Sequence, residues 1–441
     1  MNYREAWSFL DNLQFFKIKL GLESMTRFLD GLGRPQENLR FVHVAGTNGK
    51  GSVCITLLTM LVAAGYKVAL YTSPHLNSVR ERFRINNSYI SKKEFARTAG
   101  KIINILDGRR ITYFEFTTAI AMLWFAEMKA DLAILEVGMG GRLDATNVIC
   151  PLTSIITNVS MDHEAYLGNT LQAVAGEKAG IIKTGVPVIS GAADDASLEV
   201  IERTCRQKKA PLYLMGRNFF KETESDKSWT YRGIGDSGQV IKNLSCNLKG
   251  EYQVGNSAIA LAGLEILSDS GFSVNETAIR QGLNHVKWPG RLEYFNLPEA
   301  SSDQDGEKIT PLRQYLIDGA HNPAGVISLK KALETDFSFK NLVMVWASMA
   351  DKDILKNLSI IVPICRNIIM TRPKGERSAE LSALRKAVPE KYLDRVICIS
   401  SINRALDKAC KLTTPDDLIC IAGSLYLVGE ARTLLSGEVT T

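Results

Sequence analysis

Short apolar runs and helical patterns alternate along most of the chain. Five runs predict buried strands, at residues 41–45, 67–72, 132–137, 153–158 and 186–190. Helical patterns lie between them, at residues 53–64, 116–127 and 171–179, and the first of these is apolar on nearly every face. Strands that alternate with helices are typical of parallel sheets joined by crossover helices, so we expect an α/β fold.

The pattern changes in two places. Residues 211–250 contain short, polar strand candidates at 228–232 and 240–244, which predict a small antiparallel insertion, and a helical pattern returns at 251–283. Residues 300–308 are the most loop-like stretch, and a second strand–helix series follows, with strands predicted at 315–317, 342–346, 367–370 and 418–422. We therefore predict a parallel-sheet domain flanked by helices at residues 1–297 and a smaller Rossmann-like α/β domain at 298–441.

Composition narrows the class of protein. A chain of 441 residues is long enough for two domains, and 45% hydrophobic with 23% charged residues is ordinary for a globular protein. The net charge of +6 comes without any Lys/Arg-rich run, which argues against nucleic-acid binding. No apolar run reaches the roughly 18 residues of a membrane span, and the N-terminus is too charged for a signal peptide. We expect a cytoplasmic monomer that acts on small molecules.

The cysteines favour a reducing environment. The eight residues are scattered and form no CxxC pair, and several lie inside apolar runs. Buried free thiols are therefore expected rather than disulfides or a metal cluster.

A glycine-rich segment follows the first predicted strand. It contains Gly46, Thr47, Asn48, Gly49, Lys50, Gly51 and Ser52. Glycines let the backbone approach a phosphate, and the following helix contributes its positive end. Lys50 can reach the outer phosphates, and the hydroxyl of Ser52 can ligate Mg²⁺. The spacing is shorter than that of the common GxxxxGK[ST] loop, but a purely structural turn would not need the lysine. We therefore expect a P-loop-type domain that binds nucleotide phosphates.

Three further residues follow strands or lie near them. Glu136 ends a buried strand, where a carboxylate needs a cation or a donor, and Mg²⁺ or a structural salt bridge would both satisfy it. His163 follows the 153–158 strand and is a plausible metal ligand there, although an isolated histidine is more often structural. Lys178 lies on a predicted helix; it is an ordinary solvated charge unless it is buried near metal ions.

The second half of the chain contains a smaller set of candidates. Asp318 and His321 follow a predicted strand, where α/β sheets place ligand-binding groups. Arg291 lies near the domain boundary, and Ser424 follows the last predicted strand. Each could equally be a helix cap or part of a turn.

Together these segments resemble the folylpolyglutamate synthase/dihydrofolate synthase family of the Mur ligase superfamily. The resemblance runs from about residue 20 to 432 and rests on segments that occur in order: GTNGKGS, YTSPHL, TYFE, LEVGMGGRLDATN, SMDHEAYLG, EKAGI, QVGNSAIAL, PGRLE, DGAHNP, MADKD and AGSLYLVGEAR. It implies that ATP phosphorylates a substrate carboxylate and that the amine of L-glutamate then displaces phosphate, so no protein nucleophile is needed.

The resemblance also implies roles for the nucleotide and metal residues. Lys50 and the loop amides would hold the phosphates, Ser52 and Glu136 one Mg²⁺, and Glu136 and His163 a second. Lys178 matches a family lysine that CO₂ carbamylates, and it would act in catalysis together with Lys50 and His163. Further contacts would come from Asn256 to adenine and Arg291 to phosphate, and Asp318 would make a ribose or hinge-side contact.

Substrate contacts are implied in the same way. The pterin-side wall would be formed by Ser73, Pro74, His75, Tyr113, Phe114 and Glu115. His321 and Ser424 would lie toward the nucleotide or glutamate. Many bacterial relatives glutamylate both dihydropteroate and folates, so we expect both activities here.

Two alternatives remain open at this stage. Another Mur-type amino-acid ligase would share the fold, although such enzymes usually carry a separate N-terminal domain and only about 40 residues precede this loop. A P-loop ATPase that acts as a switch would hydrolyse ATP without an amino-acid substrate.

Overall fold

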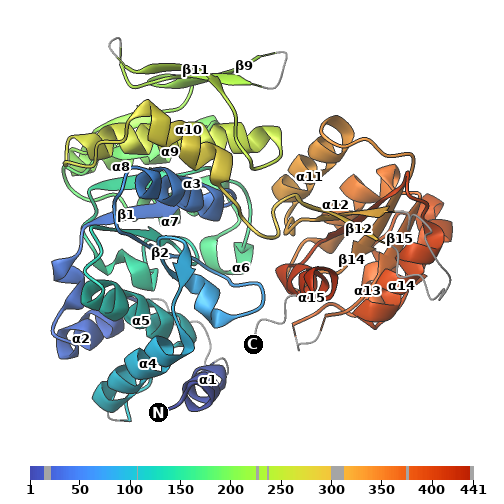
Figure 1. Cartoon of the computed structure of the whole chain (residues 1–441), viewed down its shortest axis with the longest axis horizontal. Coiled ribbons are helices and arrows are strands. Elements are labelled where there is room, and N and C mark those ends of the chain that lie inside the picture. Colours follow the sequence, from blue (N-terminus) through green and yellow to red (C-terminus); the bar gives the residue numbers. More distant parts are fainter. Residues whose placement is uncertain are drawn as a thin grey trace, which may run out of the picture. The chain divides into compact units, whose positions relative to one another are not determined.

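The computed structural model describes residues 1–13, 21–106, 108–224, 228–235, 238–298, 312–373 and 377–437, and the chain forms two compact units (Figure 1). The first unit comprises Met1–Asn247 and Gln253–Lys287, and the second comprises Leu248–Tyr252 and Trp288–Thr441. The division therefore lies at residues 287 and 288, and the boundary after residue 297 stays a prediction.

The first unit is built on a sheet with the strand order β4-β3-β2-β5-β1-β6-β7-β8. Its strands are β1 (Phe41–Ala45), β2 (Val68–Tyr71), β3 (Phe83–Ile85), β4 (Ser88–Tyr89), β5 (Leu132–Glu136), β6 (Thr153–Ile156), β7 (Val188–Ser190) and β8 (Leu212–Leu214). The strands from β2 to β8 in this order pair in parallel, which confirms the predicted α/β fold. The antiparallel edge formed by β3 and β4 was not predicted, because five residues in two strands give too little periodicity.

Helices cover both faces of this sheet. In Figure 1, α3, α9 and α10 lie over one face and α4 and α5 over the other. The helices are α1 (Tyr3–Asn12), α2 (Glu23–Gly31), α3 (Lys50–Ala63), α4 (Lys92–Leu106), α5 (Tyr113–Glu127), α6 (Glu164–Leu167), α7 (Leu171–Ala179), α8 (Asp195–Lys208), α9 (Glu251–Ser268) and α10 (Glu276–His285). Because α3 and α5 are apolar on nearly every face, they bury most of their side chains, as expected for helices packed on a sheet.

Most of the polar stretch at 211–250 forms the predicted antiparallel insertion, whereas β8 at its start joins the parallel sheet. Strands β9 (Phe220–Thr223), β10 (Trp229–Arg232) and β11 (Val240–Leu244) pair in the order β11-β10-β9. Trp229 and Tyr231 of the central strand are buried. The helical pattern at 251–283 forms two helices, α9 and α10, separated by residues 269–275.

The second unit has the strand order β12-β13-β17-β14-β15-β16. Its strands are β12 (Glu293–Pro298), β13 (Leu312–Ile317), β14 (Leu342–Trp346), β15 (Asn367–Met370), β16 (Val396–Cys398) and β17 (Leu418–Ala422). Its helices are α11 (Pro323–Thr335), α12 (Ile354–Ile361), α13 (Leu381–Lys386), α14 (Ile402–Leu412) and α15 (Leu425–Ser436). Strands β12 and β13 pair antiparallel. The other strand pairs of this sheet are parallel, as expected of a Rossmann-like domain. The loop predicted at 300–308 lies outside the described residues.

The expectations about the cysteines and about membrane spans can both be compared with the structure. All eight cysteines are free, but only Cys54, Cys205, Cys365 and Cys420 are buried, and Cys150 and Cys398 are exposed. Within the described residues, no helix combines the length and apolar content that spanning a bilayer requires.

Candidate active site

The glycine-rich loop connects the end of β1 to the start of α3. Gly46 and Gly49 have φ angles of +149° and +83°, in the region that favours glycine. A Cβ on Gly46 would lie 1.9 Å from the Thr157 hydroxyl oxygen, and one on Gly49 would lie 2.5 Å from the Asn256 amide oxygen. Backbone conformation and close packing therefore both require glycine at these positions.

Residues that follow β6 hold the loop in place. The Thr47 and Asn48 amides donate to the main-chain and side-chain oxygens of Asn158, at 3.1 and 2.9 Å. The Thr157 hydroxyl donates to the Asn48 carbonyl at 2.6 Å, and the Thr47 hydroxyl exchanges two 3.0 Å bonds with the Ser160 backbone. The loop is thus fixed mainly through its own backbone.

The N-terminus of α3 has no side-chain cap. Its N-cap residue is Gly49, which has no side chain to accept from the first-turn amides, and the first turn contains no acidic residue. The Lys50 ammonium donates back to the Gly46 and Thr47 carbonyls, at 3.0 and 3.2 Å, and Ser52 is buried. Uncapped amides, a helix N-terminus and a lysine folded over the loop form an arrangement that suits a phosphate.

Glu136 lies next to this loop in the sheet. It is the last residue of β5 and pairs in register with Val44 of β1. Its side chain is buried, and one carboxylate oxygen accepts from the Ser73 amide at 3.0 Å. Glu136 therefore links the strand beside the phosphate loop to the segment after β2.

In the strand order, β6 lies on the opposite side of β1 from β5, the strand that ends at Glu136. His163 and Lys178 follow β6 in the chain. His163 adopts a left-handed backbone (φ +52°) as the N-cap of α6, and its amide donates to Asp162 at 2.9 Å. Lys178 of α7 is 3% exposed, and burial together with the charge of Lys50 lowers its pKa to about 7, while Asp162 acts in the opposite direction. Lys50 and Asp162 are therefore the charged groups that act on the Lys178 ammonium.

Asp162 was not predicted as a site residue. The sequence signal was its position directly before His163 in the loop after a buried strand. In the structure its carboxylate approaches the His163 imidazole, with 3.9 Å between Nε2 and Oδ2.

The donor types suit a hard divalent cation. Within the described residues, no three His, Cys, Asp or Glu side chains form a ready-made metal cluster. Mg²⁺ does not need one, since it is usually held by one or two carboxylates, waters and substrate phosphates. Of the three predicted ligands, Glu136 supplies such a carboxylate, and metal binding by Ser52, Glu136 and His163 stays a prediction.

The predicted pterin-side residues come from two segments that meet near Glu136. The Phe114 ring packs on Gly138, where a Cβ would lie 2.5 Å from it, and the Arg82 guanidinium lies 5.2 Å from the Tyr113 ring centre. Arg82 also donates to the His75 Nδ1 at 2.9 Å. Ser73, Pro74 and His75 therefore lie close to Tyr113 and Phe114. Ser73 precedes a cis peptide bond to Pro74.

Glu115 has a structural position. With Thr112 it forms the capping box of α5: the Glu115 amide donates to the Thr112 hydroxyl, and the Glu115 carboxylate accepts from the Thr112 amide at 2.9 Å. Its role as a substrate contact stays a prediction.

A buried polar network joins β1 to the glycine-containing segment after β5, and the sequence analysis did not predict it. His43 of β1 is fully buried, and its Nε2 lies 2.8 Å from the Thr146 hydroxyl. That hydroxyl donates to Asp144, which also accepts the Met139 and Thr146 amides. Burial lowers the pKa of His43 to about 3 and raises that of Asp144. His43 therefore remains neutral at neutral pH.

In the second unit, three predicted residues gather around Gly319. Asp318 is buried and accepts the Leu292 and Ala320 amides at 3.0 and 2.8 Å, and burial raises its pKa although Arg291 opposes the shift. A Cβ on Gly319 would lie 1.9 Å from an Arg291 guanidinium nitrogen, and the His321 Nδ1 lies 2.8 Å from the Gly319 carbonyl.

Asn256 and Ser424 have more structural surroundings. Asn256 of α9 packs on Gly49 and donates to Gln253 at 2.8 Å. Ser424 is buried as the N-cap of α15, where its hydroxyl accepts the Tyr426 amide at 3.2 Å. Ligand contacts by these two residues stay predictions.

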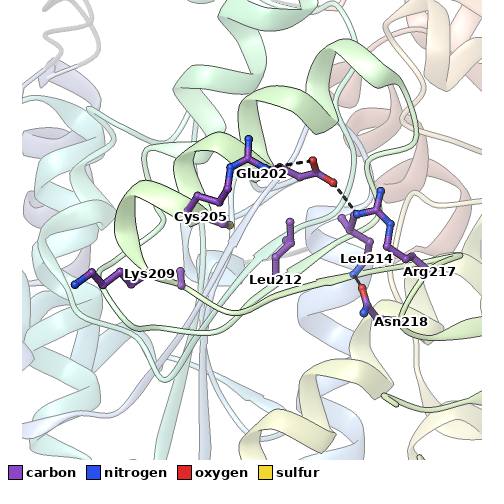
Figure 2. A pocket seen from close by; sticks show the side chains of 9 residues that line it. Glu202, Cys205, Lys209, Leu212, Leu214, Arg217 and Asn218 are labelled. Atoms are coloured by element: carbon purple, nitrogen blue, oxygen red, sulfur yellow. Dashed lines mark hydrogen bonds and ion pairs between the residues drawn. The ribbon is translucent and has the colours of Figure 1, made fainter. Parts of the chain in front are cut away.

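A pocket of about 410 Å³ lies elsewhere, at the β8 edge of the first sheet (Figure 2). Glu202 forms ion pairs there with Arg217 at 2.7 Å and with Arg206 at 3.8 Å. No predicted site residue lines it, and β8 is three strands away from β1.

Comparison with known proteins identifies the family. Residues 44–264 match the Mur ligase middle domain, and residues 306–425 match the Mur ligase glutamate ligase domain. A Bacillus subtilis dihydrofolate synthase/folylpolyglutamate synthase is 30% identical, over 98% of both chains. The chain belongs to the folylpolyglutamate synthase/dihydrofolate synthase family. It spans about half of another relative, a probable bifunctional folylpolyglutamate synthase/dihydropteroate synthase of Haloferax volcanii, with 32% identity over 98% of this chain.

Solved structures of family members have the same fold. E. coli FolC in complex with DHPP and ADP is 29% identical, with a TM-score of 0.86 and coverage of 99% of this chain and 98% of that chain. A bifunctional folylpolyglutamate synthase/dihydrofolate synthase with Mn, AMPPNP and L-glutamate bound is 28% identical, with a TM-score of 0.84 and coverage of 98% of both chains.

Proposed function

We propose that this member of the family uses ATP to ligate L-glutamate to a folate, and also to dihydropteroate. The observation that carries the proposal is the uncapped N-terminus of α3, which lies behind the glycine loop and beside Glu136. The same Glu136 holds the Ser73 amide, so the phosphate site adjoins the segment proposed to contact the pterin. Solved relatives in complex with DHPP and ADP, and with L-glutamate bound, support this choice of substrates.

The reaction follows from the weakness of a carboxylate as an electrophile. A carboxylate oxygen of the folate attacks the γ-phosphorus of ATP, which releases ADP and forms an acyl phosphate. The amine of glutamate then attacks the acyl carbon, the C–O bond to phosphate breaks, and the nitrogen loses a proton to give the amide. Positioning and neutralisation of charge are what the protein must supply, and Lys50 with the α3 amides can supply both.

We assign the metal ligands from the donor types present. Ser52 and Glu136 would hold one Mg²⁺, and Glu136 and His163 a second. A divalent cation in this position neutralises phosphate charge as it develops. The Mn-bound relative supports the use of a divalent metal.

Lys178 is proposed to carry a carbamate. Its lowered pKa leaves much of the amine neutral at physiological pH, and the neutral amine is the form that attacks CO₂ and loses a proton. The product is an anion, which removes the repulsion between Lys178 and Lys50. We expect Lys178→Ala to lose about 100-fold or more in kcat, as the loss of a charge-stabilising group does elsewhere. Added formate or acetate should restore part of the rate by replacing the carbamate. A Lys178→Ala enzyme with normal turnover would exclude the modification.

In the second unit, Arg291, Asp318 and His321 are proposed as nucleotide or glutamate contacts, since they cluster around Gly319. Asn256 is proposed to contact adenine. The cytoplasmic location and monomeric state are part of the proposal and can be tested by fractionation and light scattering.

The deciding experiment measures ADP release with dihydropteroate and with a reduced folate, each with and without glutamate. Glutamate-dependent release with both substrates is the expected result, and Lys50→Ala is the matched inactive control, because Lys50 is only partly buried and its loss should spare the core. ADP formed equally without glutamate would favour a switch ATPase. If no pterin substrate gives ADP release, with or without glutamate, a different Mur-type ligase would be favoured.

A further inference from the structure

The segment between β2 and β3 is an ordered loop held by charged side chains. The Ser73 amide donates to Glu136, as described above. The amides of residues 76–78 all donate to the Glu81 carboxylate, at 2.7–3.0 Å. We call residues 73–78 the pterin-side loop. His75 lies between these two anchored parts, so little freedom remains for its backbone.

Arg82 holds the His75 side chain. Arg82 is buried, and its carbonyl accepts the Thr72 amide at 3.1 Å, which fixes the residue at the end of β2. Its Nε donates to the His75 Nδ1 at 2.9 Å, and its guanidinium lies over the Tyr113 ring. One arginine therefore contacts residues from both segments of the predicted pterin-side wall.

This contact determines the state of the imidazole. A guanidinium nitrogen has hydrogens but no available lone pair, so it can only donate. The His75 Nδ1 must therefore accept, which places the ring proton on Nε2. In the described part of the chain no protein group bonds to that Nε2–H. His75 consequently offers a donor that is not used within the protein.

The charges around the His75 ring also favour a neutral imidazole. Arg82 is the cation in contact with it, and the Glu81 and Glu136 carboxylates are bonded to backbone amides of the loop. Burial and the charge of Arg82 lower the pKa of His75 to about 3.

We propose that Arg82 is a positioning residue that fixes His75 as an Nε2–H donor, and that this donor recognises an acceptor atom, a ring carbonyl or ring nitrogen, of the pterin. The proposal rests on the proposed function, because it takes the pterin-side loop as part of the substrate site. It differs from that function in assigning a fixed hydrogen-bond direction, which can be measured without catalysis.

The direct test is the ¹⁵N NMR spectrum of the histidine side chains. The chain has five histidines, and His75→Gln assigns the signal of interest. We expect a bare Nδ1 and a protonated Nε2 between pH 6 and 8. A proton on Nδ1, or a mixture of tautomers in the unmodified protein, would overturn the proposal whatever the enzyme's activity.

The kinetic test uses Arg82→Met. Its KM for the pterin substrate should rise about tenfold, the effect of one hydrogen bond, with the KM for ATP and glutamate unchanged. Burial is the larger cause of the lowered pKa of His75, so the ring should stay neutral in this variant too. Without the Arg82 donor neither ring nitrogen is fixed as the acceptor, so the ¹⁵N spectrum of Arg82→Met should show a mixture of the two tautomers.

Arg84→Met is the matched control. Arg84 is two residues further along, is partly buried and stacks on Tyr89 at 4.9 Å. If both variants raise the KM equally, or if Arg82→Met keeps the single Nε2–H tautomer of His75, Arg82 has only a structural role. His75→Gln, which keeps an N–H donor, should retain more affinity than His75→Leu. Absence of glutamate-dependent ADP release in the unmodified enzyme would instead refute the proposed function, and the NMR result would be unaffected.

Discussion

The phosphate loop and the pterin-side loop follow strands on either side of β5, yet they are built differently. The phosphate loop is held through its own backbone, and two glycines let it pack closely against Thr157 and Asn256. The pterin-side loop is held by the charged side chains of Glu81, Arg82 and Glu136. The first arrangement leaves no room for a side chain. The second depends on charges, each of which a single substitution can alter.

Gly46→Ala should show the largest effect. The new methyl group would overlap the Thr157 hydroxyl oxygen, which lies 1.9 Å from its position, and the loop would have to move. A displaced phosphate site should cost about 100-fold or more in kcat/KM for ATP. Gly65→Ala is the control: its φ is +93°, but no atom lies within 4 Å, so it should lose only about 1 kcal/mol of stability. Equal effects of the two changes would mean that crowding is unimportant.

His43→Gln should alter how stability depends on pH. Folding lowers the pKa of His43 to about 3, so the unfolded chain takes up a proton near pH 6.5 while the folded chain does not. The stability contributed by neutral His43 is thus present above pH 6.5 and is lost as the pH falls toward 3. Between pH 6.5 and 5 this loss is about 2 kcal/mol. Urea denaturation at several pH values should show a shallower decline in His43→Gln, and parallel curves would contradict the expectation.

Glu81→Gln tests the charged anchor of the pterin-side loop. An amide has only one accepting oxygen, so the three backbone N–H groups at 76–78 could not all be satisfied. We expect a several-fold rise in KM for the pterin substrate and a stability loss of about 1–2 kcal/mol. Glu5→Gln alters another capping box, on exposed α1, and should leave every KM unchanged. A rise in the KM for ATP instead would show that the two loops are not independent.

The phosphate side could be predicted from the sequence because its signals are local. An apolar strand, a glycine-rich turn, a lysine and an apolar helix are adjacent in the chain, and Glu136 ends a strand whose burial the pattern indicates. The parallel sheets followed from the same alternation. In each case the residues that matter lie within one strand–turn–helix unit.

The pterin side could not be predicted as fully because its contacts join distant segments. Glu81 and Arg82 lie in a run with two other charges, Arg80 and Arg84, which in sequence is typical of a solvated surface. Arg82 becomes buried because Tyr113, 31 residues later, packs over it. Likewise, nothing near His43 in the chain indicates its partner Thr146.

The uncapped start of α3 has a consequence for the lifetime of the folded protein. The N-cap glycine gives the first amides of this helix no side-chain acceptor, so a bound nucleotide would stabilise the fold as well as react. By mass action, ADP at 100 times its dissociation constant should add about 2.7 kcal/mol to the stability of the unit that binds it. In a cell rich in nucleotides, the form that proteases and chaperones encounter would then be the liganded one. A thermal-shift titration with ADP, with Lys50→Ala for comparison, would measure how far the enzyme depends on its substrate for stability.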